Sequence, residues 1–320
     1  MKRERTGRVR FPLDERVINA DCYKNLRPDM SQATLQPSLA ELKYRVVKEL
    51  GTGAGSTILL VSDNSSGKKY ALKVVKRQSA DDDVYIAQAR IEFDVSQRLH
   101  HDSILKIYDM KIKRSWFRIN GVELLMEYVD GRTLDEAPYP DMKRLLLIFV
   151  KVAEALAHMH RRGVYHGDLK PSNIMFAKNG AVKVIDFGTA WIKGENKNRV
   201  QGTPQYMAPE QAIEKVVNER TDLYNLGATM YRMFTGKYAN SGIPTVGIRG
   251  IDESRILMKS PIELNPRIPV TLNETILACL QLSPDRRPAG MFEVQNQLKA
   301  VAKYAGLKES DLKGLDVDQE

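Results

Sequence analysis

Four side chains suited to phosphate chemistry lie within one short polar stretch of the sequence: His166, Asp168, Lys170 and Asn173. Burying unpartnered groups costs roughly 2 to 7 kcal/mol even for a neutral polar group, so this stretch does not suit a hydrophobic core. Asp168 could accept the proton of a hydroxyl group, Lys170 could neutralise a phosphoryl oxygen, and Asn173 could coordinate Mg²⁺ through its carbonyl oxygen. The residue types and their spacing predict a catalytic loop for phosphoryl transfer.

Two neighbouring elements are expected to position this loop. Residues 145–161 have the amphipathic pattern of a long helix that leads into it. Residues 181–188 form an apolar strand ending in Asp-Phe-Gly, so Asp186 would bring a second oxygen ligand toward Asn173. Together they predict a site that holds Mg²⁺ against the phosphates of a nucleotide.

A glycine-rich stretch and a lysine upstream of the loop would bind the phosphates. The backbone of residues 51–58 could approach a phosphate closely, although an ordinary β-hairpin has the same appearance. Lys73 lies within the apolar strand 69–75, where a lysine either extends its ammonium group to solvent or pairs with a buried anion. A helix is predicted over residues 84–99, where apolar residues recur at helical spacing.

The order of the motifs resembles the protein kinase superfamily. The loop matches H-x-D-L-x-x-x-N, and downstream follow D-F-G, a run ending in A-P-E, T-D-L-Y-N-L-G and P-D-R-R-P, in the order of that family. Lys170 and the G-T-P-x-Y run that contains Thr203 are the serine/threonine version, and residues 261–269 are similar to bacterial members. The resemblance covers residues 42–303 and indicates a eukaryotic-like (Hanks-type) serine/threonine protein kinase of bacterial type.

The resemblance implies an α+β, two-lobed protein kinase fold, with a small β-rich N-lobe that contains one key helix and a larger, mostly helical C-lobe. It also implies two ion pairs: Lys73 with Glu92, on the helix of the N-lobe, and Glu210 with Arg287, buried in the C-lobe. The expected parts are a basic N-terminal extension (1–41), the N-lobe (42–129), the C-lobe (130–303) and an acidic C-terminal tail (304–320).

The resemblance also implies transfer of the γ-phosphoryl group of ATP to serine or threonine hydroxyls of protein substrates, with Mg²⁺ or Mn²⁺ as the metal. Asp168 would deprotonate the acceptor with help from Lys170 and Thr203. Asn173 and Asp186 would ligate the metal. The residues implied to contact or position the nucleotide are Leu50, Gly51, Thr52, Gly53, Ala54, Gly55, Ser56, Ile58, Ala71, Lys73, Glu92, Met126, Glu127, Val129 and Met175.

Three positions depart from the family pattern. Ser56 replaces the third glycine of the glycine-rich stretch, and Ser96 replaces an apolar residue of the N-lobe helix. Gly167 replaces the arginine that in most members grips a phosphate on the activation segment, residues 186–210. Residues 190–202 contain no serine, threonine or tyrosine. We therefore expect a kinase that is not switched by phosphorylation of this segment and that is controlled by its flanks or a partner.

The composition is that of a globular protein and excludes several classes. The chain has 320 residues, of which 42% are hydrophobic and 28% charged. Two cysteines and five histidines argue against a disulfide scaffold and a structural zinc site. No apolar run approaches the ~20 residues of a membrane span, and no apolar stretch follows the basic N-terminus as in a secretory signal. We expect a cytoplasmic protein.

The net charge of +9 arises partly from five basic residues between positions 2 and 10. Such an arm is either simply solvated or contacts an anionic partner, so a regulatory partner of the extension stays open. Nucleic-acid binding usually interleaves aromatic and basic residues, and Phe11 is the only aromatic residue beside this basic run. We expect no specific nucleic acid.

Two other functions share parts of the pattern. A pseudokinase scaffold would use the fold as a binding module, but it typically lacks one of Lys73, Asp168 and Asp186, which are all present. A small-molecule kinase of the aminoglycoside phosphotransferase type shares the aspartate and the asparagine of the loop but lacks the segment from D-F-G to A-P-E.

Overall fold

The computed structural model describes residues 43–53, 55–115, 118–136, 139–195, 201–239 and 258–312. The N-terminal extension expected over residues 1–41 lies outside the described residues, and so does Ala54 of the glycine-rich stretch.

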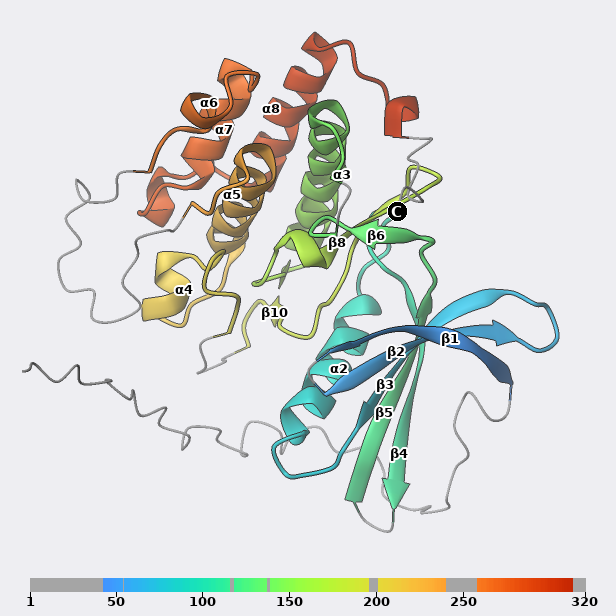
Figure 1. The fold of residues 1–320 in the computed structure, drawn as a ribbon. Coiled ribbons are helices and arrows are strands. Elements are labelled where there is room, and N and C mark those ends of the chain that lie inside the picture. The colour runs from blue at the N-terminus through green and yellow to red at the C-terminus, as the bar shows by residue number, and fades with distance from the viewer. Residues whose placement is uncertain are drawn as a thin grey trace, which may run out of the picture.

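A five-stranded antiparallel sheet forms the N-lobe, in the order β1-β2-β3-β5-β4 (Figure 1). One helix, α2, packs on the sheet against β3, β4 and β5. The bounds are β1 (Tyr44–Gly53), β2 (Ser56–Asp63), β3 (Lys69–Lys76), α2 (Asp83–Ser96), β4 (Ile107–Ser115) and β5 (Arg118–Glu127).

Alternation along β3 decides which side chains face α2. Ala71 and Val75 belong to the apolar cluster between the sheet and the helix, whereas Leu72 belongs to the cluster on the opposite face of the sheet. Because side chains of a strand alternate between its two faces, Lys73 lies on the same face as Ala71 and Val75. The lysine therefore faces the helix that carries Glu92.

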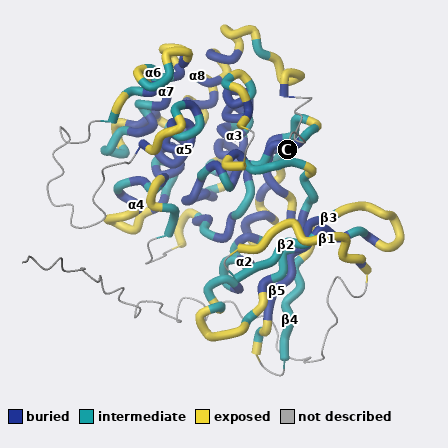
Figure 2. Tube along the Cα trace, viewed as in Figure 1, coloured by how far each residue is buried: buried dark blue, intermediate teal, exposed yellow. Residues whose placement is uncertain are grey.

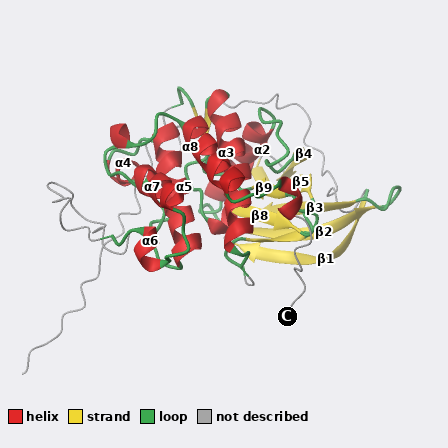
Figure 3. Cartoon of the chain, turned by 90° about the horizontal axis from the view of Figure 1, so that it is seen from above, coloured by secondary structure: helices red, strands yellow, loops and turns green. Residues whose placement is uncertain are grey.

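The C-lobe is mostly helical, and Figure 3 shows its helices gathered on one side of the molecule with the N-lobe strands on the other. Its central helices α3 and α5 are largely buried (Figure 2). No helix in the described ranges is both long and apolar enough to cross a lipid bilayer. The helices are α3 (Met142–Arg161), α4 (Pro209–Ile213), α5 (Glu219–Thr235), α6 (Pro261–Leu264), α7 (Val270–Cys279) and α8 (Met291–Tyr304), with short 3-10 helices η2 (Pro171–Asn173), η4 (Pro284–Arg286) and η5 (Glu309–Leu312).

Helix α3 begins at Met142, earlier than the predicted Leu145, because the side chain of Asp141 caps it by accepting a hydrogen bond from the backbone N–H of Arg144 at 3.0 Å. It leads into the catalytic loop, as the sequence predicted. Small strands from both sides of α3 in the sequence lie around this loop. These strands are β6 (Gly131–Thr133), β7 (Val164–Tyr165), β8 (Ile174–Ala177), β9 (Val182–Val184) and β10 (Trp191–Ile192).

The described part of the C-terminal tail packs on the C-lobe. Glu309 forms an ion pair with Lys151 of α3. Leu312 is buried, and a side chain at Gly180 would come within about 3 Å of it. Residues 309–312 are therefore part of the folded body.

Candidate active site

The catalytic loop between β7 and β8 brings Asp168, Lys170 and Thr203 together. Lys170 Nζ donates to Asp168 Oδ2 at 2.9 Å and to Thr203 Oγ1 at 2.8 Å. The backbone N–H of Thr203 donates to Asp168 Oδ1 at 2.7 Å. Thr203, which was expected to help Asp168 together with Lys170, contacts both residues: its backbone N–H donates to Asp168 and its hydroxyl accepts from Lys170. Two separate donors thus fix the orientation of the Asp168 carboxylate.

Helix α5 holds this loop from within the C-lobe through Asp222, which the sequence analysis did not single out. Its carboxylate accepts from the backbone N–H groups of His166 and Gly167 at 2.9 and 2.8 Å. Nε2 of His160 lies 2.7 Å from it. Burial alone would raise the pKa of Asp222, but the contact with His160 and the amide donors outweigh burial and hold the pKa below its ordinary value. The loop is fixed by a buried carboxylate.

The two predicted metal ligands meet where β8 and β9 run side by side. The side-chain amide of Asn173 donates to the carbonyl oxygen of Asp168 at 2.8 Å, which directs its own carbonyl oxygen elsewhere. The N–H of Ile185 donates to the carbonyl oxygen of Asn173 at 3.0 Å, so the next residue, Asp186, lies beside Asn173.

Asp186 has a φ of 64°, a strained backbone conformation for a residue that is not glycine. No group of three or more His, Cys, Asp or Glu side chains suited to a metal ion exists among the described residues. The Asn–Asp oxygen pair fits a hard cation that takes its remaining ligands from phosphates and water.

The predicted pair of Lys73 and Glu92 is present on the N-lobe side. Lys73 Nζ lies 2.6 Å from Glu92 Oε2, and Glu92 is buried. Burial would lower the pKa of Lys73, but the charges of Glu92 and Asp186 outweigh burial and raise it. Lys73 is therefore a protonated lysine held inside the site, and the alternative in which it extends to solvent is wrong.

The glycine-rich stretch forms the end of β1, a turn and the start of β2. Leu50 is 40% exposed, and Gly51 and Gly53 are also exposed, so their backbone is open to a ligand. Gly55 has a φ of +70°, which favours glycine. Their contacts with a nucleotide stay a prediction. The other residues predicted for this stretch are Thr52 in β1 and Ser56 and Ile58 in β2.

One face of α2 contacts the site at three points, and only Glu92 was predicted. A Cβ at Gly55 would lie 2.1 Å from the ring of Tyr85, so this ring packs directly on the glycine-rich turn. A Cβ at Gly188 of the D-F-G run would lie 3.1 Å from Gln88 Cβ. Because Tyr85, Gln88 and Glu92 lie at helical spacing, the pattern of the helix could have indicated this face.

The link between the lobes contains Met126, Glu127 and Val129. Met126 is buried and pairs with Ala71 across β5 and β3. The N–H of Glu127 donates to Lys106, and the carbonyl oxygen of Val129 accepts from Gly131. The contacts with the nucleotide that the resemblance implies for Glu127 and Val129 stay a prediction, as does the contact implied for Met175, which lies on β8.

The side chain of Glu127 forms an ion pair that the sequence analysis missed. Nζ of Lys183, on β9, lies 2.7 Å from Glu127 Oε1, and the Lys183 side chain is only 8% exposed. Lys183 is three residues before Asp186. The pair thus ties the link between the lobes to β9, the strand that ends two residues before the predicted metal ligand Asp186.

Comparison with known proteins shows which family this chain matches. The sequence model described as the protein kinase domain matches residues 44–299. The chain belongs to the protein kinase domain family. The match spans both lobes, from the first strand to α8, and includes every residue discussed for the site.

Bacterial kinases are among the relatives of this kinase domain. It is 30% identical over 269 residues to a probable serine/threonine-protein kinase of Clostridium acetobutylicum, with 81% of this chain and 40% of the relative covered. It is 31% identical to the serine/threonine-protein kinase PknB of Mycolicibacterium smegmatis, with 80% and 42% covered. It is 29% identical to the serine/threonine-protein kinase PrkC of Bacillus subtilis, with 82% and 40% covered. The chain therefore spans about two fifths of the length of these relatives.

The C-lobe of this kinase domain contains the predicted ion pair between Glu210 and Arg287. The two guanidinium nitrogens lie 2.7 and 2.9 Å from the two carboxylate oxygens, which is a bidentate contact. Both residues are buried. Arg287 also donates to the carbonyl oxygens of Arg220 and Gln281. The pair fastens the end of the activation segment to the helices beneath it.

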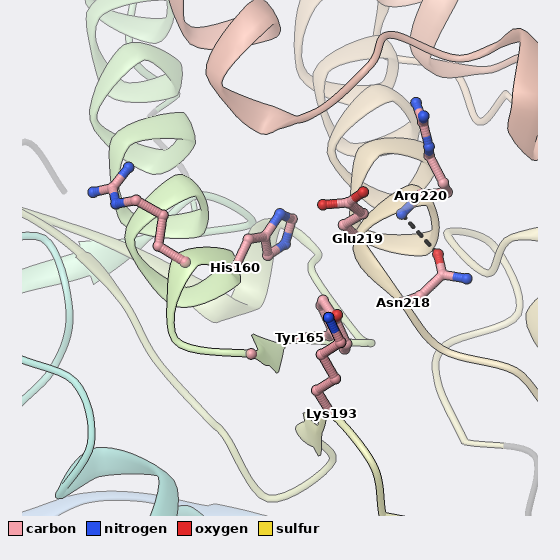
Figure 4. A pocket seen from close by; sticks show the side chains of 8 residues that line it. His160, Tyr165, Lys193, Asn218, Glu219 and Arg220 are labelled. Carbon is pink, nitrogen blue, oxygen red and sulfur yellow. Dashed lines mark hydrogen bonds between the residues drawn. The ribbon is translucent and has the colours of Figure 1, made fainter.

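A pocket of about 400 Å³ lies behind the catalytic loop of the kinase, where α3 ends and α5 begins. His160, Tyr165 and Lys193 line it together with Glu219 (Figure 4). Arg220 also lines it, and its side chain extends away from the other labelled residues in Figure 4. None of the predicted catalytic, nucleotide or metal residues lines this pocket.

Proposed function

We propose that this kinase domain transfers the γ-phosphoryl group of ATP to serine or threonine hydroxyls of proteins. The observation that carries the proposal is the cluster of Asp168, Lys170 and Thr203, in which one ammonium group bridges a carboxylate and a hydroxyl. In the family this combination is the serine/threonine version. The bacterial relatives are named as serine/threonine-protein kinases, which supports the same substrate class.

The chemistry assigned to the residues is positioning and charge neutralisation. Asp168 orients the acceptor hydroxyl and takes its proton, while Lys170 offsets charge on the transferred group. Lys73, held by Glu92, binds the nucleotide phosphates. Asn173 and Asp186 would hold Mg²⁺ or Mn²⁺, which neutralises charge on the phosphates. A turnover on the order of 1 to 100 per second is typical of such kinases.

The second part of the proposal is that phosphorylation of the activation segment does not switch this kinase. At Gly167 there is no arginine to grip a phosphate. The atoms nearest to the position of a Cβ there are Val217 Cγ1 at 3.3 Å and, at 3.6 Å, the carbonyl oxygen of Thr189 and Trp191 Cδ1. None of these three atoms can donate a hydrogen bond to a phosphate. Control would then act through the flanking segments or a partner, for which residues 1–41 are a candidate.

The alternative is a pseudokinase scaffold with weak or no transfer activity, and one observation favours it. Ser96 is buried in α2 where the family usually has an apolar residue, and its hydroxyl donates to the carbonyl oxygen of Phe93 at 2.7 Å. A serine there contributes less apolar contact to the inner end of α2 than a leucine would. Against it, Lys73, Asp168 and Asp186 are all present and arranged as described.

The test is transfer of labelled phosphate from ATP to a generic protein substrate, with the modified residues mapped by mass spectrometry. We expect phosphoserine or phosphothreonine in the substrate, and we expect Asp168→Asn to abolish transfer while ATP still binds. Treatment with a phosphatase before the assay should leave activity unchanged. Full activity of Asp168→Asn would contradict the assignment, and a phosphate on Thr189 or Thr203 that is required for activity would contradict the second part.

A further inference from the structure

The first helical turn after Glu210 contains a buried glutamine that joins two functional segments. Gln211 is 1% exposed. Its Nε2 donates to the carbonyl oxygen of Gly167, in the catalytic loop, at 2.5 Å and to that of Gln201, in the activation segment, at 2.6 Å. Gln201 lies two residues before Thr203. One carboxamide thus connects the loop that carries Asp168 with the segment that carries Thr203.

The orientation of this carboxamide is fixed by its other end. Its Oε1 accepts from the backbone N–H of Ala208 at 3.3 Å and from Nδ2 of Asn225, on α5, at 3.5 Å. Only the NH₂ end of a glutamine can donate to two carbonyl oxygens, so both ends of Gln211 are used and neither can be exchanged for the other.

The absence of a side chain at Gly202 leaves room for the hydrogen bonds of Gln211. Its φ is +131°, which L side chains rarely adopt, and a Cβ there would lie 2.7 Å from Gln211 Nε2 and 3.3 Å from the carbonyl oxygen of Gly167. A side chain at residue 202 would therefore enter the space of the contact itself. The segment can approach the loop this closely only because a glycine stands at residue 202.

We propose that Gln211 is a positioning residue for phosphoryl transfer. It holds the activation segment on the catalytic loop so that Thr203 reaches Asp168 without a phosphate on the segment. Gly167 has no side chain that could bind a phosphate. Instead, its carbonyl oxygen accepts a hydrogen bond from Gln211. This inference rests on the proposed function, since it assumes that Asp168 acts on an acceptor hydroxyl.

The main experiment compares Gln211→Met with a matched control, Gln295→Met. Methionine has a similar length but donates no hydrogen bond. Gln295 is also buried, on α8, where its Nε2 contacts Glu154 at 3.5 Å.

Turnover is measured per ATP-binding site, so that unfolded protein does not count. We expect kcat to fall about tenfold to a hundredfold in Gln211→Met, since small misplacements of reacting groups cost that much, with KM for ATP within about twofold. Gln295→Met should keep the kcat of the unmodified chain.

A second variant separates positioning from a merely structural role. In Gln211→Glu a carboxylate would face two carbonyl oxygens, and repulsion favours its protonated form, which can donate one hydrogen bond. We expect kcat of this variant, relative to that of the unmodified chain, to rise as the pH is lowered from about 8 to 6, the direction that protonation of a carboxylate gives. A pH profile parallel to that of the unmodified chain would count against the proposal.

The outcomes distinguish this inference from the proposed function. If the unmodified chain transfers phosphate and Gln211→Met does so equally per site, the role of Gln211 is overturned and the function stands. If the unmodified chain binds ATP but transfers none, the proposed function fails. The contact is then tested by trypsin cleavage after Lys197 and Arg199, which should be faster in Gln211→Met than in Gln295→Met. Equal cleavage rates would overturn the positioning role.

Discussion

Lys73 and Asp168 are charged residues on opposite sides of the proposed site, and the two lobes hold them by different means. Lys73 depends on one side-chain contact, 2.6 Å long, between a strand and the α2 helix. Asp168 lies in a loop whose backbone N–H groups bind the buried Asp222 and whose carbonyl at Gly167 binds Gln211. The catalytic loop with Asp168 is therefore held by buried hydrogen bonds of the C-lobe, whereas the contact of Lys73 depends on the position of α2.

This difference indicates which part of the kinase can be regulated at low cost in stability. Moving α2 alone breaks the ion pair between Lys73 and Glu92 and the contacts of Tyr85 and Gln88, and it disturbs the apolar cluster in which α2 packs on the sheet. Moving the catalytic loop would leave several buried N–H groups without partners, each costing about 1 to 3 kcal/mol. A switch is expected to act on α2 and the glycine-rich turn, in line with the proposal that phosphorylation of the activation segment does not switch this chain.

The largest effect is expected on the C-lobe side, from Asp222→Ala. The change leaves the N–H groups of His166 and Gly167 unpaired in the core and removes the partner of His160, so we expect the free energy of unfolding to fall by about 3 to 5 kcal/mol. Chemical denaturation measures it. Asp109→Ala, at an exposed residue of β4, is the control. A loss at Asp222 no larger than at Asp109 would refute the view that α5 anchors the loop.

The opposite behaviour is expected of Lys73→Met on the N-lobe side. Transfer activity should fall about a hundredfold to a thousandfold, the usual effect of removing a positioned charge or donor. The free energy of unfolding should fall less than in Asp222→Ala, since Glu92 can take up a proton once the lysine is gone. Lys69→Met, an exposed lysine on the same strand, serves as control. Equal destabilisation by Lys73→Met and Asp222→Ala would remove the distinction between the lobes.

A lower pH should destabilise the fold through His158, at the contact between α3 and the turn after α2. Nε2 of this histidine accepts from the backbone N–H of His100, which links α3 to the turn after α2. Burial, with a smaller contribution from Arg162, lowers the pKa of His158 to about 4. The unfolded chain, with a pKa near 6.5, binds more protons between these values, so stability is complete above about pH 6.5 and is lost as the pH falls toward 4.

Thermal or chemical unfolding between pH 7.5 and 5 measures this effect. We expect a loss of about 1 to 2 kcal/mol from His158 at pH 5. His158→Gln keeps an acceptor without titrating in this range and should flatten the pH dependence. If both proteins lose stability equally, other groups are responsible.

The smallest effect is expected where the lobes are linked, from Lys183→Met. Loss of the ion pair with Glu127 should leave the fold intact and raise KM for ATP about twofold to fivefold, with little change in kcat, since the Glu127 end of the pair is partly exposed and such an ion pair is worth about 1 kcal/mol. Steady-state kinetics at varied ATP measures it. Lys178→Met, in the turn between β8 and β9, serves as the control. An unchanged KM would mean that the pair does not help to hold the nucleotide side of the link.

Site residues that lie close together in the sequence could be predicted. Asp168, Lys170 and Asn173 lie in one loop, and Asp186 ends a recognisable strand, so their meeting follows from local sequence. The pairs Lys73–Glu92 and Glu210–Arg287 were expected from the family resemblance. Gln211 and Lys183 were not predicted, because their partners are backbone or side-chain groups far along the chain and no spacing pattern records them.

The sequence alone determined the chemistry that is available: which groups can accept a proton, carry charge or ligate a cation, and that the backbone at Gly167 carries no side chain to bind a phosphate. Only the tertiary structure decided how these groups are held. The anchoring bonds of Asp222 and Gln211 end on backbone N–H and carbonyl groups, which every non-proline residue possesses, so residue types cannot reveal them. They arise when helices α4 and α5 fold against the catalytic loop.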